Sequence, residues 1–236
     1  MAMGALTAAM WGAIGAVALV VGAWLALSYR PAAPAVGRTM GFGAGALLAA
    51  VAYELVPPGT LDNGGIFVSL GIGALVFFGL DRLVTRRQRP GSDTANRSIA
   101  LGALLDGVPE SLVLGMSLAA GGRVSIAFLV AVFVSNLPEG LGASAGMRDS
   151  GTPARRIYLM WWGIVAVSAV AAALGYGLLR FVPGADGSLV QAFAAGAVLT
   201  MLADSMIPEA YEEGGKLTGL LTVLGFTVAG ALTLLE

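Results

Sequence analysis

Two short polar segments interrupt long apolar runs in the middle of the chain. The first segment holds Asp106 and Glu110, and the second holds Ser135, Asn136 and Glu139. Residues three or four positions apart lie on the same face of a helix. As helices, both segments would therefore present carboxylate, amide and hydroxyl oxygens on one face, and such oxygens are ligands for divalent cations. The two segments together predict two halves of one metal site.

A proline precedes the glutamate in each segment. Pro109 and Pro138 cannot donate a backbone hydrogen bond to the carbonyls four residues back, at Leu105 and Val134. We therefore expect bent helices and free carbonyl oxygens at the depth of the carboxylates. The plainer alternative is that each proline only bends its helix, and that protonated acids hydrogen-bond to neighbouring helices.

The acids in these segments need a compensating charge. Burying one charged carboxylate in the middle of a bilayer costs about 2.5–3.5 kcal/mol on insertion scales. Three acids, Asp106, Glu110 and Glu139, share this surrounding, and no Lys or Arg lies within the apolar runs that carry them. A divalent cation, bound protons, or both are the available compensation.

The composition identifies the class of protein that must position these residues. Of the 236 residues, 57% are hydrophobic and only 11% are charged, whereas soluble domains average about 25% charged residues. The chain therefore cannot cover a soluble globule, and we predict an all-α integral membrane protein. Without cysteine or histidine, it cannot offer thiolate or imidazole ligands to a metal. A metal site must use oxygen atoms.

Other function classes are disfavoured by the same composition. Gly142, Ser144 and Gly146 match the G-x-S-x-G spelling of a hydrolase nucleophile, but no histidine is present to activate the serine. We therefore expect no enzyme, and an intramembrane hydrolase is the least favoured alternative. No basic patch suggests nucleic acid as a partner. The pair Trp161-Trp162 is typical of an aromatic anchor at the membrane interface.

Eight apolar stretches approach or exceed the roughly 20 residues that a helix needs to cross a bilayer. They predict a single polytopic transmembrane domain over residues 1–236, with a short basic loop at 84–97 between the third and fourth spans. The lipid bilayer is therefore one expected partner. The predicted spans are Leu6–Ser28, Thr39–Val56, Ile66–Leu83, Ile99–Ala119, Ser125–Met147, Tyr158–Phe181, Ser188–Tyr211 and Leu217–Leu235.

Basic residues gather on one side of these spans. The loops after the first, third, fifth and seventh spans, with the adjoining span ends, carry eleven of the thirteen Lys and Arg residues. The other side carries only Arg123 and Arg180. Because Lys and Arg favour cytoplasmic loops, we expect both termini to be extracytoplasmic in a cell membrane, either plasma or inner.

The second and seventh spans share a pattern. Phe42-Gly43-Ala44-Gly45-Ala46 corresponds to Phe193-Ala194-Ala195-Gly196-Ala197, and the fourth and fifth spans share their Pro-Glu steps. Three, two and three spans, with oppositely oriented outer triplets, predict an inverted-repeat (3+2+3) transporter with a site at the repeat interface.

Three further acids lie near the ends of predicted spans. Glu54 ends the second span, and Asp204 and Glu209 lie near the end of the seventh. Such acids fit a pathway along which an ion enters and leaves. They are equally ordinary as interfacial acids within reach of water, so both interpretations stay open here.

The two polar segments also carry a family resemblance. Asp106-Gly107-Val108-Pro109-Glu110-Ser111 and Ser135-Asn136-Leu137-Pro138-Glu139-Gly140 resemble the paired His-Asn-x-Pro-Glu-Gly motifs of the ZIP family of divalent metal transporters. The resemblance looks closest to the bacterial GufA-like branch and covers nearly the whole chain. It implies a homodimer and an elevator-type transporter that brings zinc, iron or manganese into the cytoplasm through a binuclear site.

By position, Glu110 and Glu139 match the metal-bridging glutamates of the family. The chain departs from the pattern at Asp106, where the family usually has His, and at Gly107, where it has Asn. The sixth span offers no acid, which places a second metal position in question. An all-oxygen site favours harder ions such as Mn²⁺, although carboxylates also bind Zn²⁺ and Fe²⁺. The metal is expected as substrate, with no organic cofactor, and the alternative is a metal-binding or metal-sensing membrane protein without transport.

Overall fold

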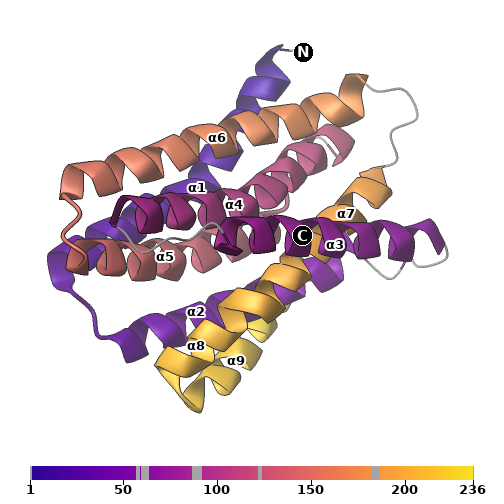
Figure 1. Cartoon of the computed structure of the whole chain (residues 1–236). Coiled ribbons are helices and arrows are strands. Elements are labelled where there is room, and N and C mark those ends of the chain that lie inside the picture. The colour runs from indigo at the N-terminus through magenta and orange to yellow at the C-terminus, as the bar shows by residue number, and fades with distance from the viewer. Residues whose placement is uncertain are drawn as a thin grey trace.

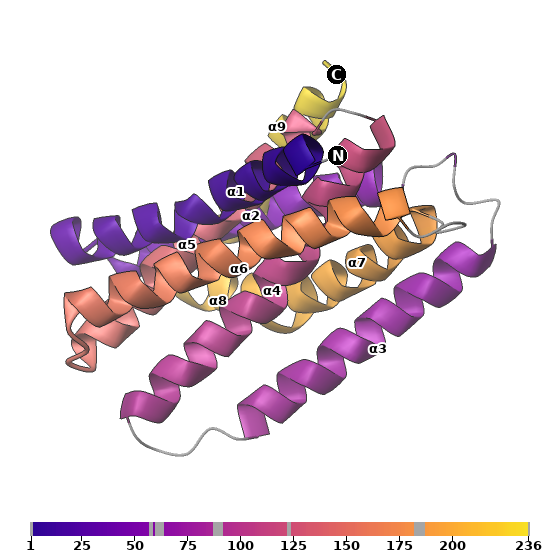
Figure 2. The same cartoon turned by 90° about the horizontal axis from the view of Figure 1, so that it is seen from above.

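The computed structural model describes residues 2–56, 59, 64–86, 92–121, 124–181 and 187–235, and over these residues the fold is entirely helical (Figures 1 and 2). Within these described ranges, seven helical segments are long and apolar enough to cross a membrane. The prediction of an all-α, multi-span membrane protein is therefore confirmed. The elements are α1 (Ala2–Tyr29), α2 (Ala33–Ala50), η1 (Val51–Leu55), α3 (Gly64–Arg86), α4 (Ser92–Gly121), α5 (Ile126–Asp149), α6 (Ala154–Phe181), α7 (Gly187–Met201), η3 (Leu202–Met206), α8 (Ile207–Gly214) and α9 (Leu217–Thr233).

Each of the eight predicted spans is occupied by helix. The eighth, α9, has 17 residues and is shorter than the other seven. α4 begins at Ser92, before the predicted span at Ile99, because the helix continues through polar residues that the apolar pattern does not mark. Helix ends thus occupy 84–86 and 92–97 of the predicted basic loop, and residues 87–91 lie outside the described part. Arg87, Arg89 and Arg123, used above to predict the orientation, also lie outside it.

The helix ends follow local chemistry. Ser125 caps α5, and its hydroxyl accepts a hydrogen bond from the backbone N–H of Phe128 at 3.1 Å. At the other end of α5, the guanidinium of Arg148 donates to the carbonyl of Ala26 at 2.6 Å. This bond ties the ends of α5 and α1 together. Gly215, with φ of 70°, makes the turn from α8 into α9, a conformation that glycine adopts readily.

The helices form two groups. In the first group, α1 packs on α5 and α6, and α4 packs on α6. In the second group, α2 packs on α8 and α9, and α3 packs on α7 at the outer edge of the molecule (Figure 2). The two groups meet most extensively where α2 lies along α5, whereas α7 touches α4 over a smaller area.

Glycines bring the helices of the second group into backbone contact at equivalent positions. A Cβ atom at Gly45 would overlap the carbonyl oxygen of Thr222 in α9, and one at Gly196 would overlap that of Leu70 in α3. Gly45 and Gly196 are 151 positions apart, and Thr222 and Leu70 are 152 apart. The α2–α9 pair therefore repeats the α7–α3 pair. Reciprocal contacts complete both pairs: Gly225 against Phe42, and Gly73 against Phe193.

The first group shows the same pairing. A Cβ atom at Gly22 of α1 would overlap the carbonyl oxygen of Leu137 in α5, and one at Gly175 of α6 would overlap that of Leu112 in α4. The glycines on the partner helices, Gly140 and Gly115, make the reciprocal contacts. Close approach at small residues is a usual means of packing membrane helices.

Two π-helical turns lie at equivalent places in the fold. η1 continues α2 and η3 continues α7, and their first residues, Val51 and Leu202, are again 151 positions apart. The wider π turn is rare and often marks a functional site. The internal spacing of the sequence is therefore matched by a local distortion of the backbone.

The expectation for the tryptophan pair is half wrong. Trp161 is fully buried, and its indole N–H donates to the hydroxyl of Ser144 at 2.8 Å. Trp162 is exposed, as an interfacial anchor would be. The bond gives Ser144 a packing role between α5 and α6, whereas Gly142 and Gly146 of the same pattern line the cavity described below.

Candidate metal centre

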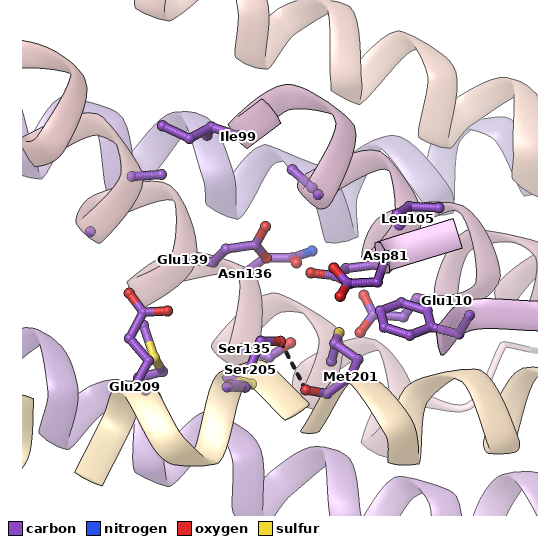
Figure 3. A pocket seen from close by; sticks show the side chains of 18 of the residues that line it. Asp81, Ile99, Leu105, Glu110, Ser135, Asn136, Glu139, Met201, Ser205 and Glu209 are labelled. Atoms are coloured by element: carbon purple, nitrogen blue, oxygen red, sulfur yellow. Dashed lines mark hydrogen bonds between the residues drawn. The ribbon is translucent and has the colours of Figure 1, made fainter. Parts of the chain in front are cut away.

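A cavity of about 370 Å³ lies between the two helix groups (Figure 3). Its first wall comes from α4 and α5, and its second from α2, α3, α7, η3 and α8. All five residues predicted to bind metal line this cavity: Asp106, Glu110, Ser135, Asn136 and Glu139. The structure thus brings together side chains from two separate segments of the sequence.

On α4, Glu110 is the deepest acid, with 2% of its surface exposed. One oxygen of its carboxyl group, Oε2, is buried and has no hydrogen-bond partner within the described part of the chain. A buried polar atom without a partner is costly, and a bound cation or proton would satisfy it. Asp106 lies one helical turn earlier on the cavity wall and is only partly buried.

On α5, the polar side chains are held in place by backbone groups. The hydroxyl of Ser135 donates to the carbonyl of Val132 at 2.9 Å. The amide nitrogen of Asn136 donates to the carbonyl of Gly15 in α1 at 3.2 Å, which leaves the amide oxygen as an acceptor. Both residues are buried, while Glu139 is partly exposed on the cavity wall.

The facing wall adds an acid that the sequence analysis missed. Asp81 of α3 lines the cavity together with Ser205 of η3 and Glu209 of α8. The Ser205 hydroxyl donates to the carbonyl of Met201 at 2.9 Å (Figure 3). Asp81 stands next to Arg82 near the end of the third predicted span, so it resembles an ordinary interfacial acid. One feature of the sequence could have identified Asp81: it is the only acid in the third predicted span.

The acids are spread along the cavity. Figure 3 shows Glu209 and Glu110 toward opposite ends, with Glu139 between them. No three carboxylates in the described ranges converge closely enough to hold one metal ion. An ion in this conformation would therefore bind one or two carboxylates, neighbouring amide or hydroxyl oxygens, and water.

Two of the predicted pathway acids lie away from the cavity. Glu54, in η1, and Asp204, in η3, do not line it, and Asp204 is exposed. Glu209 does line it. The three acids are therefore not equivalent, although the sequence analysis treated them alike.

The two prolines lie inside continuous helices. Leu105, whose carbonyl Pro109 frees, lines the cavity, but Val134, its counterpart before Pro138, does not. The carbonyl oxygen of Val134 lies instead beside Gly43 of α2. The structure thus supports a freed carbonyl oxygen beside the cavity on α4, but not the second one that was expected on α5.

The charge of the cavity has one sign. Among the described residues, five acids line it and no Lys or Arg does. A cleft lined by charges of one sign raises the local concentration of counter-ions, so this cavity attracts cations. The lining acids are Asp81, Asp106, Glu110, Glu139 and Glu209.

The cavity extends from Glu110 toward one end of the bundle only. Its lining continues to Ile99 in the first third of α4 and to Gly146 near the end of α5. This is the end where the α1–α2 and α5–α6 turns lie (Figure 1), and we refer to it as the basic side. Toward the opposite side, buried apolar residues close the space between the groups. They include Leu47, Ala50, Val113, Leu114, Val132 and Val198.

Comparison with known proteins gives one informative relative. The chain is 30% identical to the zinc transporter ZIPB of Bordetella bronchiseptica over 244 aligned positions, which cover 94% of this chain and 78% of that protein. No family model matches the chain. The likeness therefore extends over almost the entire helical bundle and includes both polar segments.

Proposed function

Because the chain belongs to the ZIP family of metal transporters, we propose that it carries divalent transition-metal ions into the cytoplasm through the carboxylate site on α4 and α5. The observation that carries this proposal is a cavity that, among the described residues, is lined by five acids and no base, with a buried oxygen of Glu110 that finds no partner there at its deep end. The zinc transporter relative supports zinc as one substrate. The carboxylate, amide and hydroxyl oxygens of the lining support manganese and iron as others.

The residues that line the cavity have different roles in binding the ion. The ion sheds part of its hydration shell and exchanges water for oxygens of one or two carboxylates at a time, among Glu110, Glu139 and Asp106. Asn136 offers its amide oxygen, because its nitrogen is held by the carbonyl of Gly15. Three acids against one divalent ion leave a negative excess, which retains the ion and favours proton binding when the ion leaves.

The ion crosses as the two helix groups move past each other. The 3+2+3 inverted repeat supports this motion, because it gives each group two equivalent ways to pack against the other. The support for the repeat is the reciprocal glycine contacts and the paired π turns, both spaced by 151 or 152 residues.

The conformation described above is open to the basic side, which we place in the cytoplasm by the excess of Lys and Arg. Glu209 and Asp81 then lie on the path by which the ion leaves. Glu54 lies toward the opposite side, and its role on the path by which the ion arrives stays a prediction. The position of Asp204 does not support a role on either path. The extracytoplasmic termini and the homodimer also stay predictions.

The test is metal uptake by the purified protein in liposomes, with zinc, manganese and iron(II) supplied separately. Uptake that saturates with metal concentration and needs the protein supports transport. Equilibrium binding without flux in the same liposomes would instead identify a metal-binding or metal-sensing protein of this fold.

Metal binding is expected to weaken steadily as the pH falls from about 8 to about 5.5, because carboxylic acids must lose their protons before they bind metal. No histidine is present to add a second titration in this range. The measurement is the equilibrium dissociation constant against pH, together with the protons released on binding. An affinity independent of pH, with no proton release, would contradict the carboxylate site.

A bulky side chain at Gly146 is expected to block the cavity. Gly146 lines the cavity on α5, and apart from its chain neighbours and the backbone of its own helix, no described atom lies within 4 Å of the position that its Cβ would take. Gly146→Phe should therefore fold normally but lower uptake by about tenfold or more, since a ring would stand in the ion's path. Gly79→Phe in α3 is the matched control: its Cβ position is equally open, but it does not line the cavity. Equal losses in both variants would point to a folding defect.

A further inference from the structure

Gly43 of α2 lies directly on the second polar segment. A Cβ atom at this position would stand 2.8 Å from Cα of Ser135 and 3.1 Å from the carbonyl oxygen of Val134. Distances below 3 Å to backbone atoms are essentially never seen for a real Cβ, so only glycine permits this approach. Gly43 is thus the point at which α2 closes against α5 beside the site.

The internal repeat gives Gly43 a counterpart. A shift of 151 residues, the shift that relates the two π turns, leads from Gly43 to Ala194 of α7. The counterpart of Ser135 in the first polar segment is Asp106 of α4. The cavity lies between the part of α4 that holds Asp106 and the end of α7, where Met201 lines it.

The contact between α2 and α5 and the contact between α7 and α4 would alternate: one closes when the other opens. In the conformation described, α2 lies against α5 and the cavity separates Asp106 from Met201 and Ser205. If the helix groups exchange their packing, as the proposed transport requires, α7 closes on α4 and Ala194 takes the place that Gly43 holds now. The methyl group of Ala194 would then meet the backbone at Asp106. α7 would therefore lie some tenths of an ångström farther from α4 than α2 now lies from α5.

We propose that this Gly43/Ala194 difference makes the state open to the basic side the resting state of the transporter. Both residues act as positioning residues, because they set how closely α2 and α7 approach the two metal-binding segments. The inference rests on the proposed transport function, since only a protein that alternates between two packings has a second state to disfavour. Because protein interiors are close-packed, a single methyl group at such a contact changes the free energy of packing.

Cysteine labelling tests this inference directly, because the natural chain has no cysteine and therefore no background. One reporter, Ser205→Cys, lines the open cavity, and the other, Ala50→Cys, lies buried in the apolar packing on the opposite side. Each is introduced with or without Ala194→Gly in the full-length protein, in nanodiscs that expose both sides. The rate of reaction with a hydrophilic maleimide is measured without metal, so the result does not depend on transport.

Ala194→Gly is expected to slow labelling at Ser205→Cys and to speed it at Ala50→Cys, each by about threefold or more, because the shift in population is read at both sites. Gly43→Ala should act in the same direction by weakening the closed contact. Ala195→Gly is the matched control, since it removes the same methyl group from a neighbouring buried position in α7.

Unchanged rates in Ala194→Gly, or an equal change in Ala195→Gly, would overturn the inference. If Gly43→Ala fails to fold, Ala194→Gly alone decides, because it removes an atom and adds none. A protein that shows the expected labelling shifts but carries no metal would refute the proposed function and leave the conformational bias standing.

Discussion

Replacing Glu110 and Glu139 together by glutamine is expected to lower metal uptake into liposomes by about a hundredfold or more. Glutamine keeps the size of each side chain and one carbonyl oxygen, but it removes two negative charges from the cavity. A hundredfold loss corresponds to about 2.7 kcal/mol, a modest demand for the loss of two ionic metal contacts. The same variant should lose equilibrium binding of zinc and manganese in parallel.

Glu212→Gln provides the matched control. Glu212 is exposed on α8 and does not line the cavity, so its neutralisation should leave uptake within about twofold of the natural protein, as expected of a remote surface substitution. If the double variant transports as well as the natural protein, Glu110 and Glu139 are not the metal ligands. If the double variant and Glu212→Gln lose uptake equally, the effect is one of overall charge and not of the site.

The sequence predicts the helices well, because membrane helices obey one strong rule. Every backbone polar group must be paired inside the bilayer, so an apolar run of about 20 residues has few alternatives to helix. The runs beginning at Leu6, Ile66 and Ser188 accordingly appear as helices with slightly longer ends. The ends differ where polar residues such as Ser92 extend a helix beyond the apolar core.

The alignment of the five predicted metal-binding residues on one face of α4 and one face of α5 follows from helix periodicity. What periodicity cannot supply is the facing wall. Asp81 reaches the cavity only because α3 packs on α7, and that contact depends on Gly73 and Gly196. Trp161 is buried for a similar reason, since the space for it depends on Ser144 of another helix. Contacts between distant segments decide both cases.

The spread of the acids could not be predicted either. Spacing places Asp106 and Glu110 on one helix face and Glu139 on another, but the distance between the two faces depends on how α4 and α5 approach α2 and α7. The sequence suggested one compact cage. The structure shows acids distributed along a cavity that is open at one end, which suits an ion in passage.

Asp106→His is expected to change which metal the protein prefers. The charged ligands of the natural lining are all carboxylate oxygens, which suit Mn²⁺ as well as Zn²⁺, whereas an imidazole nitrogen favours Zn²⁺. Asp106 is partly exposed in a cavity of about 370 Å³, so an imidazole fits without displacing a packed helix. We expect the ratio of Zn²⁺ to Mn²⁺ uptake, measured in competition in the same liposomes, to rise by about tenfold.

Asp106→Asn separates the two properties that Asp106→His changes. Asparagine removes the negative charge but keeps an oxygen ligand, so it should weaken uptake of both ions and leave their ratio nearly unchanged. A ratio that rises as much in Asp106→Asn as in Asp106→His would show that charge, and not ligand type, controls selectivity at this position. A ratio unchanged in both variants would place the selecting ligands elsewhere, with Glu139 and Asn136 as the next residues to replace.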